Sequence, residues 1–311
     1  MLNVNIRLYA DRDDVVLQTY ILADSPELTP GKPRPAVLIC PGGAYLGTSD
    51  REAEPIALQF NAHGYQAFVL RYSTFYRGNM KDIPAAGSPV PGNRRARYPE
   101  PLLDLARAML VIAGNAGLWL VDPDRVAVCG FSAGGHLAAS LGVHWAEPWL
   151  SEALGLEAGS TAIRPAAMIL GYPLTDFVAN KQKISQIKAL DPAAVNLWHA
   201  VNLAVFENPE PADADLLAAS PARQVGRLTP PAFIWHTAND RVVPVDNSLN
   251  LAAALAEQGI SFELHIFRHG SHGLALADET TAALPEQINQ PVQAWLRLAL
   301  TWLDSLLRNG D

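Results

Sequence analysis

VAVCGFSAGGHLAASL, residues 126–141, decides the fold of this chain of 311 residues. Its first four residues are an apolar run typical of a buried strand, and the residues after Ser132 are typical of a helix. Gly130 and Gly134 flank Ser132 in a G-x-S-x-G pattern, and only glycine-sized neighbours allow so sharp a turn between strand and helix. The stretch therefore predicts a nucleophile elbow with the Ser132 hydroxyl exposed at the helix N-terminus. Serine is also a common helix N-cap, so the prediction depends on the rest of the chain.

Short apolar runs alternate with helical segments along most of the chain. Continuous apolar runs are typical of parallel strands covered on both faces, and we expect them at 36–40, 66–70, 126–129, 166–170, 232–236 and 262–267. Helical spacing predicts helices at 51–62, 100–114, 133–145, 247–258 and 286–307. Segments 3–9 and 15–22 indicate an antiparallel hairpin at one edge. The pattern predicts an α/β fold with a mostly parallel sheet of about eight strands and helices on both faces.

Two segments interrupt this alternation. Residues 72–99 are rich in proline and glycine, and they predict a long loop between a strand and a helix. Residues 173–229 combine prolines with short helical pieces, and they predict a cap-like insertion between strands six and seven. Long loops in compact domains are usually functional, and both segments should cover the carboxyl ends of the strands, where α/β sheets bind ligands. We expect a single domain over residues 1–311.

Composition excludes several classes of protein. With 49% hydrophobic and 17% charged residues the chain is expected to be globular, and a net charge of -8 argues against a nucleic-acid partner. The first residues lack the pattern of a signal peptide, and no apolar run reaches membrane-spanning length, so we expect no membrane association and a cytoplasmic location. Cys40 and Cys129 end apolar runs and are expected to be a reduced, buried pair. Histidines do not cluster with other ligands, so no metal is expected.

A serine nucleophile needs a base to remove its proton and an acid to orient that base. In the α/β-hydrolase order Ser, Asp, His, the acid is expected to be Asp240, after the apolar run 232–236. The base is expected to be His272, after the run 262–267. Asp176 is an alternative acid, and His269 is an alternative base.

Acyl transfer also needs amides that stabilise the oxyanion. One is expected from Ala133, directly after the nucleophile. The second is expected from the loop CPGGAY at 40–45, where Gly43 and Ala44 are the candidates. A simple Pro-Gly-Gly turn is the alternative reading of this loop.

Several segments together resemble a known family, the bacterial α/β-hydrolase esterases. The closest resemblance is to the acetyl-esterase group related to acetylxylan and feruloyl esterases, which is often labelled xylanase-B-like. The matching segments, from about residue 35 onward, are 41–45, 49–57, 64–65, 70–72, 130–138 and 235–240.

This resemblance implies hydrolysis of short acyl esters, on sugars among other substrates, without a cofactor. It also implies that Ser132, Asp240 and His272 form a catalytic triad. The chain departs from the family at Pro41, where many relatives have His, and at Ala44, where they have a third Gly.

Aromatic side chains near these loops are candidates for the substrate pocket, with core packing as the alternative. The candidates are Tyr45, Tyr72, Phe131, Tyr172 and Trp198. Arg94, Arg95 and Arg97 are expected to form a solvated basic patch, with recognition of an acidic substrate as the alternative.

Three other functions stay open at this point. An amidase acting on a small aryl formamide and a serine peptidase of the prolyl-oligopeptidase type use the same chemistry. A hydrolase fold that only binds a small molecule is the non-enzymatic alternative. The expected partner in each enzymatic case is a small molecule, and a homo-oligomer is left open.

Overall fold

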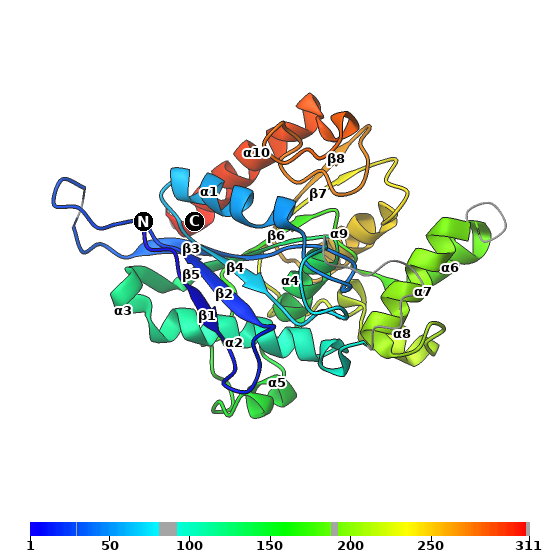
Figure 1. Ribbon diagram of the computed structural model, residues 1–311, viewed down its shortest axis with the longest axis horizontal. Coiled ribbons are helices and arrows are strands. Elements are labelled where there is room, and N and C mark those ends of the chain that lie inside the picture. The colour runs from blue at the N-terminus through cyan, green and yellow to red at the C-terminus, as the bar shows by residue number, and fades with distance from the viewer. Residues whose placement is uncertain (29, 81–91, 188–191, 309–311) are drawn as a thin grey trace.

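The computed structural model describes residues 1–28, 30–80, 92–187 and 192–308, and it contains an eight-stranded sheet in the order β1-β2-β4-β3-β5-β6-β7-β8 (Figure 1). The strands are β1 Asn5–Arg7, β2 Val16–Tyr20, β3 Arg34–Cys40, β4 Gln66–Arg71, β5 Val121–Phe131, β6 Met168–Gly171, β7 Ala232–Thr237 and β8 Phe262–Phe267. β1 and β2 pair antiparallel, β2 pairs antiparallel with β4, and the other neighbours are parallel. The predicted mostly parallel sheet with an antiparallel hairpin at one edge is confirmed.

Helices cover both faces of the sheet. α1 Glu54–Ala62 and α10 Gln290–Leu307 lie on one face, and α2 Glu100–Gly114, α4 Ala133–His144 and α9 Asp246–Glu257 lie on the other (Figure 1). The strands between them are apolar on both sides: in β3, Leu38 packs toward α2 and α4, whereas Ile39 packs toward α1 and α10. Continuous apolar runs are therefore required, because each face of the sheet has its own buried core.

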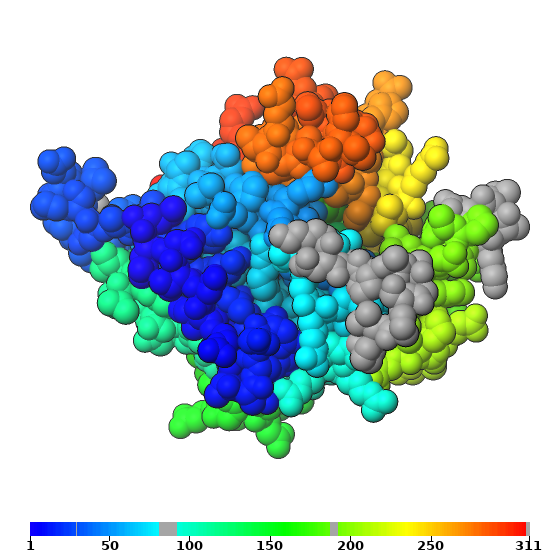
Figure 2. Space-filling model, in the orientation of Figure 1, coloured from blue at the N-terminus to red at the C-terminus, as the bar shows by residue number. Residues whose placement is uncertain are grey.

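The described residues between β6 and β7 contain three α-helices. They are α6 Phe177–Ile187, α7 Pro192–Phe206 and α8 Asp213–Ala218, and they form a lobe at one side of the molecule (Figure 2). Two short helices, α3 Ala116–Trp119 and α5 Pro148–Ala153, complete the α-helices of the described residues. We call the α6–α8 segment the cap. The expected cap-like insertion at 173–229 thus contains regular helices, while part of the long loop predicted at 72–99 lies outside the described residues.

Two helices begin later than predicted. The expected helix 51–62 begins at Glu54, because Asp50–Glu52 forms a separate 3-10 turn. The expected helix 286–307 begins at Gln290, because Pro285–Gln287 forms a separate 3-10 turn and Asn289 caps α10. The Asn289 side chain accepts a hydrogen bond from the Val292 amide, which satisfies a helix N-terminal donor.

The parallel strands end at the same edge of the sheet. The loops after β3, β5, β7 and β8 therefore meet there, and these loops carry the candidate site residues. Within the part of the chain that the structure describes, no helix has both the length and the apolar character needed to cross a membrane.

Candidate active site

Ser132 occupies a strained turn between β5 and α4. Its backbone has φ 53° and ψ -118°, in the region that favours glycine. The glycines around it are required by contact: a Cβ on Gly134 would lie 2.0 Å from the Cys40 carbonyl oxygen, and one on Gly130 would lie 2.1 Å from the Gly134 carbonyl oxygen. The turn predicted from the G-x-S-x-G pattern is therefore present, with Ser132 at its apex.

The structure brings Ser132, His272 and Asp240 together in one hydrogen-bonded chain. His272 Nε2 lies 2.8 Å from Ser132 Oγ, and His272 Nδ1 lies 2.7 Å from Asp240 Oδ2. Because the carboxylate accepts a hydrogen bond from Nδ1, Nε2 is left without a hydrogen and can accept the Ser132 proton. The geometry is that of a general base held next to a nucleophile.

Asp240 is held as an anion. Its side chain is buried, and Oδ1 accepts hydrogen bonds from the amides of Val242 at 2.8 Å and Val243 at 3.0 Å. Burial alone raises the pKa of Asp240, but the charge of His272 and hydrogen bonds from His236 and His272 outweigh it and hold the pKa below its usual value.

His236 is a site neighbour that the sequence analysis did not single out. It is buried at the end of β7, and its Nε2 lies 3.0 Å from the Val243 carbonyl oxygen and 3.3 Å from Asp240 Oδ2. Its Nδ1 lies 2.8 Å from Ser248 Oγ, which leaves Nε2 to carry the hydrogen. His236 thus contributes a second imidazole to the surroundings of Asp240. Its position four residues before Asp240 was the only signal in the sequence.

The two alternative residues lie in other environments. Asp176 is buried and accepts hydrogen bonds from Arg223 at 2.9 Å and Asn250 at 2.9 Å. Its carboxylate therefore stabilises the cap and does not orient His272. The side chain of His269 is exposed. The geometry therefore favours Asp240 and His272 over both alternatives.

The loop after β3 presents amides beside the nucleophile. Gly43, Ala44 and Tyr45 have positive φ values of 133°, 58° and 59°, so the chain turns sharply there. The Gly42 amide donates to Glu52 Oε2 at 2.7 Å, which removes it as an oxyanion donor. Within the described residues, no backbone acceptor is found for the amides of Gly43, Ala44 and Ala133, the three expected donors.

The expectation that four aromatic residues line the substrate pocket is wrong. Tyr45, Tyr72, Phe131 and Tyr172 are all at most 1% exposed. Their rings fill the core beneath the site, and the three hydroxyls bond internally: Tyr45 to His136, Tyr72 to the Pro41 carbonyl and Tyr172 to Glu52. These residues support the loops of the site rather than contact a substrate in it.

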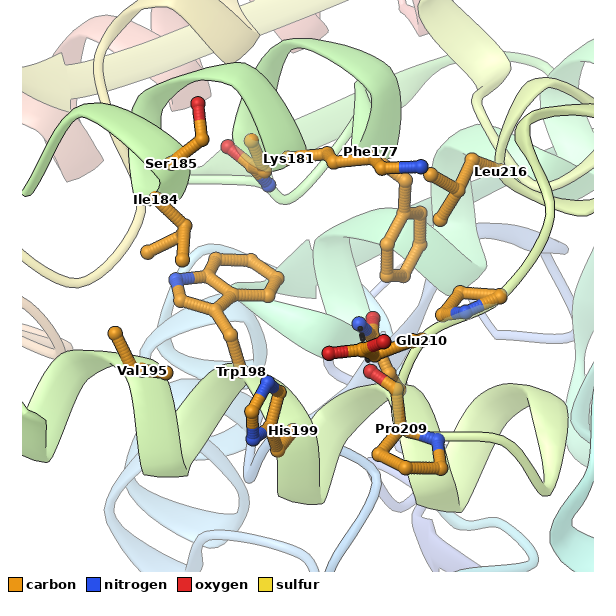
Figure 3. Close-up of a pocket in the computed structure, with 13 residues that line it drawn as sticks. Phe177, Lys181, Ile184, Ser185, Val195, Trp198, His199, Pro209, Glu210 and Leu216 are labelled. Carbon is orange, nitrogen blue, oxygen red and sulfur yellow. Dashed lines mark hydrogen bonds between the residues drawn. The ribbon is translucent and has the colours of Figure 1, made fainter. Parts of the chain in front are cut away.

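Trp198 lines a cavity in the cap. The cavity has a volume of about 400 Å³, and Phe177 and Trp198 reach into it from α6 and α7 (Figure 3). Ser132, Asp240 and His272 are not among its lining residues. The cavity that Trp198 lines in the cap is therefore separate from the candidate triad.

The basic residues at 94–97 face acidic side chains at the surface. Arg95 pairs with Asp11 at 3.0 Å, and Arg94 and Arg97 lie 3.9 Å and 3.4 Å from Glu207. All three are more than half exposed, as expected of a solvated patch. Among the residues that the structure describes, no group of three His, Cys, Asp or Glu side chains could hold a metal ion. Cys40 and Cys129 are buried free thiols.

The chain was compared with known protein families, and one family model matches its central part. Residues 92–255 match the family model BD-FAE, a segment that contains the elbow and Asp240. A curated relative, endo-1,4-beta-xylanase B of Butyrivibrio fibrisolvens, is 33% identical over 79% of this chain. The chain spans only 33% of that relative's length, and 48% and 45% of two further curated relatives.

Solved structures match over nearly the whole chain. An acetyl ester-xyloside bifunctional hydrolase from Caldicellulosiruptor lactoaceticus is 30% identical, with a TM-score of 0.71 and coverage of 97% of this chain and 96% of its own. The carboxylesterase Cest-2923 from Lactobacillus plantarum WCFS1 is 29% identical, with a TM-score of 0.74 and 98% coverage of both chains. The three names give no support to the amidase or peptidase alternatives.

Proposed function

This chain belongs to the BD-FAE family, and we propose that it is a serine esterase that cleaves short-chain acyl esters through an acyl-enzyme. The observation that carries the proposal is the hydrogen-bonded chain from Ser132 through His272 to Asp240, with distances of 2.8 Å and 2.7 Å. The Ser132 hydroxyl alone is a weak nucleophile near neutral pH, and this chain supplies the base that it needs.

The proposed reaction has two halves. His272 Nε2 takes the Ser132 proton as Oγ attacks the ester carbonyl, and Asp240 stabilises the resulting imidazolium. The amides of Ala133 and Gly43, with Ala44 as the alternative to Gly43, donate to the oxyanion of the tetrahedral intermediate. His272 then returns the proton to the leaving alcohol. Water, activated by the same imidazole, attacks the acyl-Ser132 ester and releases the acid.

The proposed substrate class is acetyl-type esters, including those on sugars such as xylan oligosaccharides. Its support is the acetyl ester-xyloside hydrolase, which is similar to this chain along almost its entire length. No cofactor takes part in the proposed mechanism. A single domain, a cytoplasmic location and a homo-oligomer stay predictions from the sequence.

Hydrolysis of p-nitrophenyl acetate, butyrate and octanoate tests the proposal. We expect the rate to fall as the acyl chain lengthens, and Ser132→Ala to lower kcat by about 10⁴-fold or more, because the nucleophile is lost. Ser140→Ala is the matched control, since Ser140 is a buried serine on the same helix α4, and it should keep full activity. Full activity in Ser132→Ala would refute the proposal.

A further inference from the structure

Glu52 is a buried carboxylate that the proposed mechanism does not use. It ends the 3-10 turn Asp50–Glu52 before α1 and is only 4% exposed. Its Oε2 accepts the Gly42 amide at 2.7 Å, and its Oε1 accepts the Tyr172 hydroxyl at 2.6 Å. Both carboxylate oxygens are therefore bound to groups in separate loops of the candidate site.

The contact with Gly42 lies directly against the nucleophile. A Cβ on Gly42 would stand 3.0 Å from Ser132 Cβ, 2.8 Å from the Phe131 carbonyl oxygen and 2.7 Å from Glu52 Oε2. The hydrogen bond from Gly42 to Glu52 thus fixes the Pro41–Gly42 peptide, which is one peptide before the one that carries the N–H of Gly43, the expected oxyanion donor. A charged acceptor makes such a bond shorter and stronger than a neutral one.

The contact with Tyr172 leads to the histidine. The Tyr172 hydroxyl also accepts the Ala275 amide at 2.9 Å, three residues after His272. The Tyr172 ring packs edge-on against the His272 imidazole, with ring centres 5.0 Å apart. Burial, then the nearby charge of Glu52, raises the pKa of Tyr172 well above its usual value, so the phenol stays a hydrogen-bond donor.

We propose that Glu52 is a positioning residue for ester hydrolysis, which holds the Gly42–Gly43 oxyanion segment and, through Tyr172, the loop of His272 in register with Ser132. The inference rests on the proposed function. It deepens that function by naming a group that acts through the Gly43 amide and His272 without touching the substrate.

The test is Glu52→Gln, which keeps the shape of the side chain but offers one oxygen acceptor in place of two. One of the two donors, the Gly42 amide or the Tyr172 hydroxyl, then faces an NH₂ group. We expect kcat for p-nitrophenyl acetate to fall about 10- to 100-fold with little change in KM, because small displacements of catalytic groups have effects of this size. Tyr172→Phe should lower kcat in the same direction. The double variant should lose less than the product of the two single losses, because both changes break one network.

A matched control is available on the other face of the sheet. Asp104 in α2 is also buried, and its carboxylate accepts the Tyr9 hydroxyl at 2.7 Å and the Ser73 amide at 2.8 Å. Asp104→Asn and Tyr9→Phe remove hydrogen bonds of the same types away from Ser132. They should lower the melting temperature while kcat of the folded enzyme stays within about twofold of the wild type.

A boronic acid that forms a tetrahedral adduct with serine separates positioning from general destabilisation. Its Ki should rise in Glu52→Gln in proportion to the loss of kcat, and should not change in Asp104→Asn. Unchanged kcat in Glu52→Gln, a change in KM alone, or equal losses in Glu52→Gln and Asp104→Asn would each overturn the inference. Failure of the proposed function is seen separately, as activity that survives in Ser132→Ala.

Discussion

At the scale of single residues, His136 shows how the site is tied to the cap. It lies four residues after Ser132 and is fully buried. Its Nδ1 lies 2.6 Å from the Tyr45 hydroxyl in the oxyanion loop, and its Nε2 lies 2.7 Å from the Ala219 carbonyl oxygen next to α8. Because Nε2 faces a carbonyl it carries the hydrogen, and Nδ1 accepts from Tyr45. The neutral imidazole therefore joins the oxyanion loop to the residue next to α8.

This burial predicts a pH dependence of stability. Desolvation lowers the pKa of His136 from 6.5 to about 4. Between these values the unfolded chain binds a proton that the folded chain does not, so stability is lost as the pH falls from 7 to 4. The gap corresponds to about 3–4 kcal/mol, at about 1.4 kcal/mol per pKa unit.

Urea unfolding at pH 7 and pH 4 measures this effect. His136→Gln keeps one acceptor and one donor in the same place without a titrating group, so its stability should fall less over that range than that of the wild type. Equal losses in the two proteins would contradict the account of His136.

At the scale of elements, the elbow depends on contact between β3, β5 and α4. Gly134 in α4 lies so close to the end of β3 that an added methyl would meet the Cys40 carbonyl oxygen at 2.0 Å. The obstacle is backbone, which cannot rotate away as a flexible side chain would. The glycine therefore determines how near the helix of the nucleophile comes to the oxyanion loop.

Gly134→Ala should lower the free energy of unfolding by about 1–3 kcal/mol, because the helix must move away from β3. Gly114→Ala is the control, since Gly114 ends α2 and nothing lies within 4 Å of its added Cβ. That variant should keep the wild-type stability or gain up to about 1 kcal/mol. Chemical denaturation of the wild type and the two variants measures these free energies of unfolding. Equal stability of Gly134→Ala and the wild type would contradict the packing described for the elbow.

Most of these elements could be predicted from the sequence, for a physical reason. A strand covered on both faces must be apolar throughout, so the runs 36–40 and 232–236 mark β3 and β7 almost to the residue. The start of α10 was missed because Pro285 begins a 3-10 turn that has the same local composition as a helix start. Local composition therefore located the core elements better than their ends.

At the scale of the whole molecule, the sheet divides the buried residues into two cores. Tyr45 and Tyr72 belong to the core shared with α2 and α4, and Phe131 and Tyr172 belong to the core shared with α1 and α10. All four were candidates for the substrate pocket because aromatic faces suit acyl and sugar groups, but the aromatic type does not reveal on which side of a sheet a residue is buried. Glu52 was missed for the opposite reason, since a carboxylate in a polar segment is normally exposed.

The molecule also brings distant segments to one point. Ser132 and Asp240 are 108 positions apart in the chain and His272 a further 32, yet parallel strands place their loops at one edge of the sheet. Chain order was enough to predict these three residues. The hydrogen bonds that hold them, from His236 and from the Glu52–Tyr172 pair, depend on tertiary packing and became visible only in the structure.

The central claim is that Ser132 is the activated nucleophile, and labelling with a fluorophosphonate probe tests it most directly. Intact mass and peptide mapping should find one adduct, on Ser132, in the wild type, and none in Ser132→Ala. His272→Ala should label much more slowly, because the Ser132 proton has no base to accept it. An unlabelled, folded wild-type protein, or an adduct that persists in Ser132→Ala, would contradict the account.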